Sequence, residues 1–166
     1  MHYSNDIKYC FDTSAFITLH RFYPDSLIHG LWQSLEELFD AGRIISHEIV
    51  FNEIVPKTGN KDSLAIWIEK YKTHFLSRTQ YQVNLLPDIL RNFPKLIDPE
   101  HEKEQADPWL LAMIIENMEN EGIFGIHSQH VLVTTESKKS TTKLPAACKY
   151  YSIRHMDLFE FFESNA

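Results

Sequence analysis

Short segments rich in β-branched and aromatic residues alternate along this chain with segments of helical periodicity. The run IKYCF over 7–11 is typical of a buried strand, and the residues that follow it favour a helix. Repeated alternation of this kind predicts an α/β fold, with a central parallel sheet of four to five strands and helices on both faces. A chain of 166 residues is long enough for one core, so we expect a single domain over 1–166.

Local signals place the individual elements. Pro24-Asp25-Ser26 is a start signal for a helix that Gly42 ends. Pro87 and Pro94 interrupt a helical pattern over 79–98, which predicts a broken or kinked helix there. The predicted strands are 7–11, 43–46, 130–135 and 146–151, the predicted helices are 12–20, 27–41, 47–55, 62–77, 106–122 and 156–163, and the polar segments 98–105 and 136–143 are expected to be loops.

Composition and charge exclude several classes of protein. The net charge of -7 argues against broad, sequence-blind binding to phosphate backbones, although it permits a local basic patch. No segment approaches the roughly 18 apolar residues of a membrane span, and the N-terminus lacks the form of a secretion signal. Cys10 and Cys148 lie in apolar stretches and are expected to be buried, reduced thiols. We therefore expect a cytoplasmic protein.

Four acids occupy comparable positions in the predicted elements. Asp12 follows the first strand, Glu53 lies on the helix after the second, Asp107 opens a later helix, and Glu136 follows the strand at 130–135. Because open α/β sheets bind ligands at the carboxyl ends of their strands, we expect these acids to meet at one edge. Crowded carboxylates repel one another, and a divalent cation removes that penalty. An all-oxygen set suits Mg²⁺ or Mn²⁺, whose usual substrate is a phosphate ester.

Each of these acids also has a purely structural interpretation. Asp12 could cap the helix that follows it. Asp107 precedes Pro108, and the two form a favourable pair for the N-cap and the first position of a helix. Glu53 and Glu136 could be solvated surface acids. The chemical interpretation therefore depends on all four lying together.

At these residues the sequence resembles the PIN-domain ribonucleases, including the VapC-like toxins of bacterial toxin–antitoxin pairs. The resemblance rests on Asp12-Thr13-Ser14 after the first strand, Glu53 in SHEIVFNEI, Asp107 in ADPWLLAMI and, loosely, Thr134-Thr135-Glu136. It spans nearly the whole chain. It is nearest to a PIN-like subfamily with Asp-Pro-Trp at the third acid and a late segment like that at 143–148.

The resemblance implies a three-layer PIN-like fold and a ribonuclease that uses Mg²⁺ or Mn²⁺ to hydrolyse RNA phosphodiester bonds. It makes Asp12 and Asp107 the central metal ligands, with Glu53 and Glu136 completing the catalytic and metal-binding set. The hydroxyls that could support this site by hydrogen bonds belong to Thr13, Ser14 and Thr134. The implied partners are an RNA substrate, a cognate antitoxin protein and a second copy in a homodimer. The alternative is a non-catalytic PIN-like module that binds protein or RNA.

Two features depart from the family pattern. The fourth acid is Glu136 where Asp is commoner, and the stretch 57–105 is longer than the matching part of a typical short toxin. RNA binding could use cations near the strand ends or in adjoining loops, and the alternative is that these are solvated surface residues. The candidate RNA-binding cations are Lys8, Arg43, Lys138, Lys139 and Lys143.

Overall fold

A five-stranded parallel sheet forms the centre of the molecule, with the strand order β3-β2-β1-β4-β5. The computed structural model describes residues 6–125 and 128–165. The strands are β1 (Ile7–Phe11), β2 (Ile44–His47), β3 (Phe75–Leu76), β4 (Gln129–Val133) and β5 (Arg154–Met156). The helices are α1 (Thr13–Phe22), α2 (His29–Asp40), α3 (Glu48–Ile54), α4 (Ser63–Lys70), α5 (Gln80–Asn92), α6 (Ala106–Ile123), α7 (Leu144–Tyr150) and α8 (Leu158–Ser164), with short 3-10 helices at Lys72–His74 and Pro94–Leu96.

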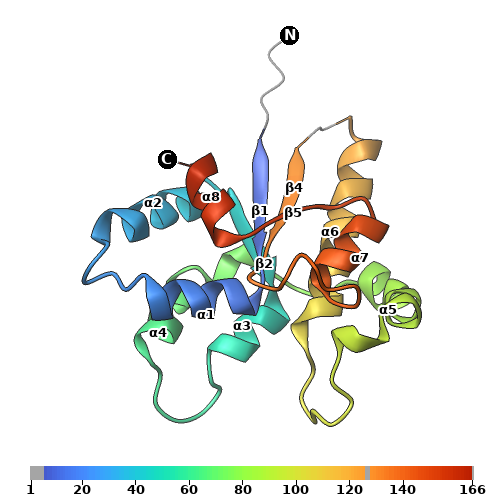
Figure 1. The fold of residues 1–166 in the computed structure, drawn as a ribbon, viewed down its shortest axis with the longest axis horizontal. Coiled ribbons are helices and arrows are strands. Elements are labelled where there is room, and N and C mark those ends of the chain that lie inside the picture. The colour runs from blue at the N-terminus through green and yellow to red at the C-terminus, as the bar shows by residue number, and fades with distance from the viewer. Residues whose placement is uncertain (1–5, 126–127, 166) are drawn as a thin grey trace.

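Helices cover both faces of this sheet, which confirms the predicted three-layer, PIN-like arrangement (Figure 1). Helices α1, α2, α4 and α8 pack on one face, whereas α5, α6 and α7 pack on the other. Successive side chains of β1 point to opposite faces of the sheet, so this strand contributes to the hydrophobic core on each face. Tyr9 and Phe11 enter the first core and contact the ring of Phe161 edge to face, whereas Cys10 enters the second.

Helix boundaries follow the predicted signals closely. Gly42 takes a positive φ of 65° just after α2, which is the backbone conformation that favours glycine at a helix end. Asp157 caps α8 in a capping box with Glu160. Both cysteines are free and buried, as predicted. Across the described ranges 6–125 and 128–165, every helix is too short or too polar to cross a membrane.

The predicted helix over 62–77 is wrong in its second half. Helix α4 ends at Lys70, and Phe75–Leu76 forms the edge strand β3, paired with β2 through Ser46 and His47. The apolar spacing of the segment is helical, but the unpaired edge of β2 provides a partner that the periodicity does not reveal.

The predicted strand over 146–151 is also wrong, because that segment forms most of α7. Pro145 stands in the first turn of α7, where its missing N–H costs nothing, and the last strand is β5 instead. A short apolar run does not distinguish a buried strand from a buried helix. The segment 79–98 is interrupted as predicted near Pro94, but α5 continues through Pro87.

Candidate metal and catalytic site

Asp12 lies at the carboxyl end of β1, where its carboxylate is almost completely buried and fully hydrogen-bonded. It is the N-cap of α1, accepting the N–H of Ala15 at 2.7 Å. The hydroxyl of Ser14 lies 2.8 and 2.9 Å from its two oxygens, and the hydroxyl of Thr134 donates to Oδ2. With the residue only 2% exposed, the capping interpretation of Asp12 is correct, and it does not compete with a role in binding a metal.

Glu53 connects three elements at the same edge of the sheet. Its Oε1 accepts the N–H of Ala106 at 2.9 Å, and its Oε2 accepts the hydroxyl of Thr13. Glu53 itself belongs to α3, Thr13 begins α1, and Ala106 begins α6. The first N–H of α6 has no acceptor within its own helix, and the Glu53 carboxylate supplies one.

The predicted capping role of Asp107 is wrong. Helix α6 begins at Ala106 with Gln105 as its N-cap, so Asp107 and Pro108 are the second and third helical residues. Glu53 accepts the N–H of Ala106, the first residue of α6. Asp107 is thus left with its carboxylate near other acids rather than turned back onto its own helix.

Burial and like charges raise the pKa of Asp107 to about 8. Burial is the largest cause, followed by the charges of Asp12, Glu136 and Glu53, while Lys143 lowers it. The pKa of Asp12 is also raised, to about 6, again mainly by burial. Hydrogen bonds from Thr134, Ala15 and Ser14 lower it, and the charge of Glu136 raises it. The acids are therefore close enough to oppose each other's ionisation.

Glu136 completes the cluster from the loop after β4. Its Oε2 accepts the N–H of Leu144 at 2.9 Å, which ties the loop to the start of α7. The backbone N–H of Glu136 donates to the hydroxyl of Thr134 at 3.2 Å. The topology thus brings together the four predicted acids from four separate parts of the chain.

The predicted supporting hydroxyls lie among these acids. Thr13 donates to Glu53, and both Ser14 and Thr134 donate to Asp12. Ser14 also accepts the N–H of Thr135 at 3.2 Å, which joins the beginning of α1 to the end of β4. These bonds hold the Asp12 carboxylate in one orientation.

The donor set suits a hard divalent cation, because every nearby candidate ligand is a carboxylate oxygen. In the described parts of the chain, however, no three His, Cys, Asp or Glu side chains are already gathered as one metal-binding group. Glu53 and Glu136 each accept a backbone N–H instead. Asp12 likewise accepts the N–H of Ala15, whereas the Asp107 carboxylate accepts no hydrogen bond from the described residues and lines the open cleft. Asp107 is thus the best-placed direct ligand, and the other three acids would bind through water or after releasing those amides.

The predicted cations divide into three groups. Lys8 and Arg43 do not lie beside the acids: they lie at the amino ends of β1 and β2, where they donate to the carbonyls of Gly42 and Ile7. Their inclusion in the patch was wrong, because a cation near a strand can lie at either end. Lys138 pairs with Glu160 and Asp157 of the α8 cap, and Lys139 is exposed in the loop after β4. Lys143 is exposed and close enough to lower the pKa of Asp107.

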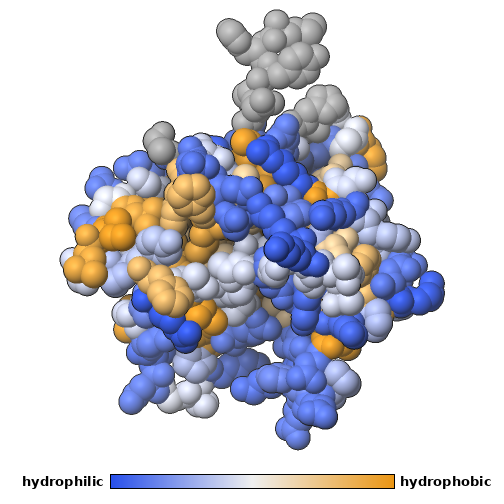
Figure 2. All heavy atoms as spheres, viewed as in Figure 1, coloured by the Kyte–Doolittle hydropathy of each residue, from blue (hydrophilic) through white to orange (hydrophobic). Residues whose placement is uncertain are grey.

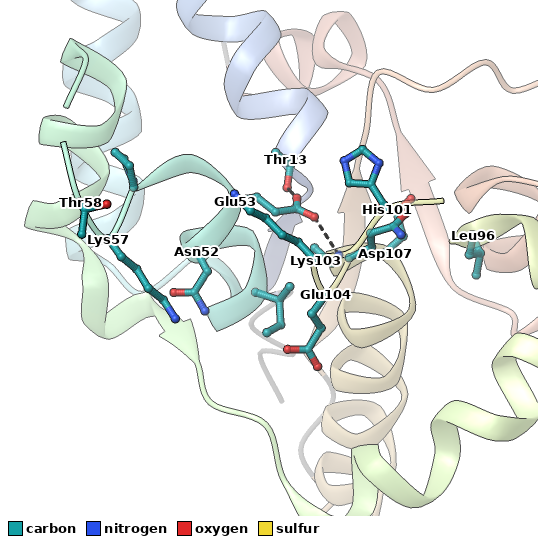
Figure 3. A pocket seen from close by; sticks show the side chains of 14 residues that line it. Thr13, Asn52, Glu53, Lys57, Thr58, Leu96, His101, Lys103, Glu104 and Asp107 are labelled. Carbon is teal, nitrogen blue, oxygen red and sulfur yellow. Dashed lines mark hydrogen bonds between the residues drawn. The ribbon is translucent and has the colours of Figure 1, made fainter. Parts of the chain in front are cut away.

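A cleft of about 820 Å³ opens beside the acids (Figure 3). Thr13, Glu53 and Asp107 form the part of its lining that belongs to the acid cluster. The rest comes mainly from α3, the turn after it and the loop before α6, including Asn52, Lys57, His101, Lys103 and Glu104. In the sequence, only the length and the charged residues of the segment 57–105 indicated this cleft.

Comparison with known proteins adds the family. A search of curated proteins finds no match for the chain. The model of a family described as "Domain of unknown function (DUF4411)" matches residues 9–166, which include all the helices and nearly all the sheet. The chain belongs to the DUF4411 family.

Proposed function

We propose that this protein is an endoribonuclease that uses Mg²⁺ or Mn²⁺ to hydrolyse RNA phosphodiester bonds. The observation that supports it best is the position of Asp107, which is half-buried near Asp12, Glu53 and Glu136 at the carboxyl edge of the sheet. Carboxylates that raise one another's pKa in this way are unfavourable unless a cation or a proton compensates their charge. The resemblance of the acid motifs to those of PIN-domain ribonucleases supports the same proposal.

In this proposal the chain's own residues have distinct roles. Asp12 and Asp107 bind the cation, and Ser14 and Thr134 keep the Asp12 carboxylate aimed at it. Glu53 and Glu136 bind it directly or orient its water. A bound divalent cation lowers the pKa of a water molecule and neutralises charge on the phosphate. Lys143 adds positive charge on the side of Asp107.

The biological role that we propose is that of a cytoplasmic toxin with a cognate antitoxin protein. Exposed apolar side chains on and just after α1, namely Phe22, Leu27 and Ile28, support a protein partner. Figure 2 shows hydrophobic residues gathered over this side of the molecule. A homodimer is a further prediction, and a monomeric mass by light scattering at high concentration would exclude it.

The alternative function is a non-catalytic module that binds RNA or protein. It is favoured by the backbone N–H groups that Glu53 and Glu136 accept, because those bonds give both acids a structural purpose. The ribonuclease would need Asp12 to cleave RNA, whereas the binding module would cleave no RNA at all.

A cleavage assay separates these functions. We expect the purified protein to cleave single-stranded RNA in Mn²⁺, and EDTA to abolish cleavage. Changing groups that only support a metal ligand typically costs 10–100-fold, so Asp12→Asn should reduce the rate by more than roughly 100-fold. Glu163→Gln, which removes an exposed acid of α8, is the matched control and should cleave normally. Expression of the wild type, but not of Asp12→Asn, should also stop growth.

Two results would contradict the proposal. The first is an absence of cleavage of any cellular RNA in Mn²⁺ together with harmless expression, which would favour the binding module. The second is equal cleavage by wild type and Asp12→Asn, which would indicate a contaminating nuclease.

A further inference from the structure

The cleft beside the acids has two walls formed by separate loops. One wall is formed by α3, which carries Asn52, and by the turn after it, which carries Lys57; the other is the loop 98–105, which carries His101 and Lys103 (Figure 3). Glu53 lies between them in this view. Both loops project from the same end of the molecule, and their surface there is largely hydrophilic (Figures 1 and 2). The cleft therefore leads from the acid cluster toward solvent between two polar walls.

The loop 98–105 is held in place rather than loosely attached. Gln105 closes its base, donating to the carbonyl of Asp98 at 2.8 Å and accepting the N–H of Asp98 at 2.8 Å. Arg78 makes two parallel hydrogen bonds to Glu104, at 3.1 and 2.9 Å. Lys103 therefore lies on a preformed loop, next to Glu104, which Arg78 holds in place.

Lys57 and Lys103 are the cations best placed to bind an anion in this cleft. Both are exposed, and within the described ranges 6–125 and 128–165 neither belongs to an ion pair. Lys138, by contrast, is paired with Glu160 and Asp157. Two ammonium groups on opposite walls, beside acids that suit a divalent cation, give the cleft positive charge for contacts with phosphates.

We propose that the cleft binds the single-stranded part of an RNA substrate next to its scissile phosphate, with Lys57 and Lys103 contacting the flanking phosphates. This inference rests on the proposed nuclease function and names the residues that position its substrate. The chain has a net charge of -7, so attraction to phosphate has to be local rather than spread over the surface.

The cleft is large enough for a short stretch of unpaired nucleotides. Its volume of about 820 Å³ lies within the roughly 300–1,000 Å³ of sites that enclose drug-sized ligands. The exposed ring of His101 on the same lining offers a surface on which an unpaired base can stack.

The test measures binding separately from cleavage. Fluorescence anisotropy would follow a labelled single-stranded oligouridine, and an RNA duplex of the same length, on Asp107→Asn protein in Mg²⁺. Adding Lys57→Ala and Lys103→Ala should weaken single-strand binding at least tenfold at low salt. It should also reduce the slope of log affinity against log salt by about 1.4, since each phosphate contact on a single strand contributes about 0.7.

The matched control is the pair Lys70→Ala and Lys149→Ala, which removes the same charge from exposed helix ends outside the cleft. It should bind like its parent. Equal binding by the cleft variant and the control pair would overturn the inference, as would equal affinity for the duplex or no binding to RNA by the parent protein.

Failure of the proposed function gives a different result. If wild type cleaves RNA but loss of the two lysines leaves binding unchanged, the nuclease proposal stands and the cleft proposal fails. If wild type cleaves nothing but the lysine variant still loses its affinity for the single strand, the cleft is an RNA-binding site of a non-catalytic module.

Discussion

Single carboxylates in this protein have structural roles at the same place where we propose a metal site. Asp12 caps α1 and at the same time presents a buried, oriented carboxylate at the sheet edge. Glu53 accepts the first N–H of α6, and Asp107 lies inside that helix rather than at its N-cap. The free-energy cost of burying several carboxylates near one another falls mainly on Asp107, whose pKa rises to about 8.

Replacing Asp107 should therefore stabilise the metal-free protein. In EDTA at pH 8, Asp107→Asn removes a buried charge near three other acids, which we expect to stabilise the fold by roughly 2–4 kcal/mol. Each kcal/mol corresponds to about 2–4 °C for a chain of this size, so the melting temperature should rise by roughly 5–10 °C.

Asp107→Ala distinguishes this cause from capping. We expect it to melt above wild type as well, because the side chain is not the cap of α6. A capping role would make Ala about 0.5–2 kcal/mol worse than Asn. Both variants should lose Mn²⁺ binding in a titration. An Asn variant that melts below wild type would show that the acids do not destabilise one another.

The start of α6 and the loop 98–105 are positioned mainly by Arg78. Its Nε donates to Glu48 at 2.9 Å, its other nitrogens bind Glu104, and its guanidinium lies 4.8 Å from the ring centre of Trp109. One side chain thus connects α3, the loop and α6. Exposed ion pairs contribute little individually, but a network with ideal two-point geometry contributes more.

Arg78→Ala should loosen the loop without unfolding the domain. We expect a loss of about 1 kcal/mol in local stability, which corresponds to roughly fivefold faster tryptic cleavage after Lys103. Lys103 is the one basic site for trypsin within 98–105. The control is Arg91→Ala, whose partner Asp88 lies on the same helix. Equal protection of Lys103 in both variants would remove Arg78 from this positioning role.

Across the whole molecule, the acid cluster should make stability depend on pH in an unusual direction. The folded pKa of Asp107 lies at about 8, above its ordinary value of 3.8. The folded state therefore binds more protons than the unfolded state, so the contribution of Asp107 to stability is most favourable at low pH and falls as pH rises toward 8. The pKa of buried His47 is lowered, mainly by burial, and opposes this trend below the ordinary value of 6.5.

Between pH 7 and pH 8 the metal-free protein should lose roughly 1 kcal/mol, or about 2–4 °C in melting temperature. Thermal unfolding in EDTA at the two pH values measures this. In Asp107→Asn the difference should largely disappear, because its main source is gone. A wild-type melting temperature that is constant or rises over this range would contradict the predicted repulsion.

Part of the order of strands and helices could be predicted from the sequence because local chemistry sets it, although β3 was missed and α7 was taken for a strand. The β-branched and aromatic run at 7–11 and the turn at Gly42 act within a few residues. The same logic placed Asp12 at the end of a strand. The meeting of the acids followed from a general property of parallel sheets, in which the carboxyl ends of the strands share an edge.

Long-range contacts determined the remaining features. Phe75 joins a strand because β2 has an open edge. Asp107 does not cap α6 because that helix begins one residue earlier, at Ala106, whose N–H donates to Glu53 from a distant part of the chain. Lys57 and Lys103 come together only through two loops that face each other across the cleft. Periodicity and capping signals report on neighbours along the chain, whereas strand partners, hydrogen-bond acceptors and cleft walls come from segments that folding brings close.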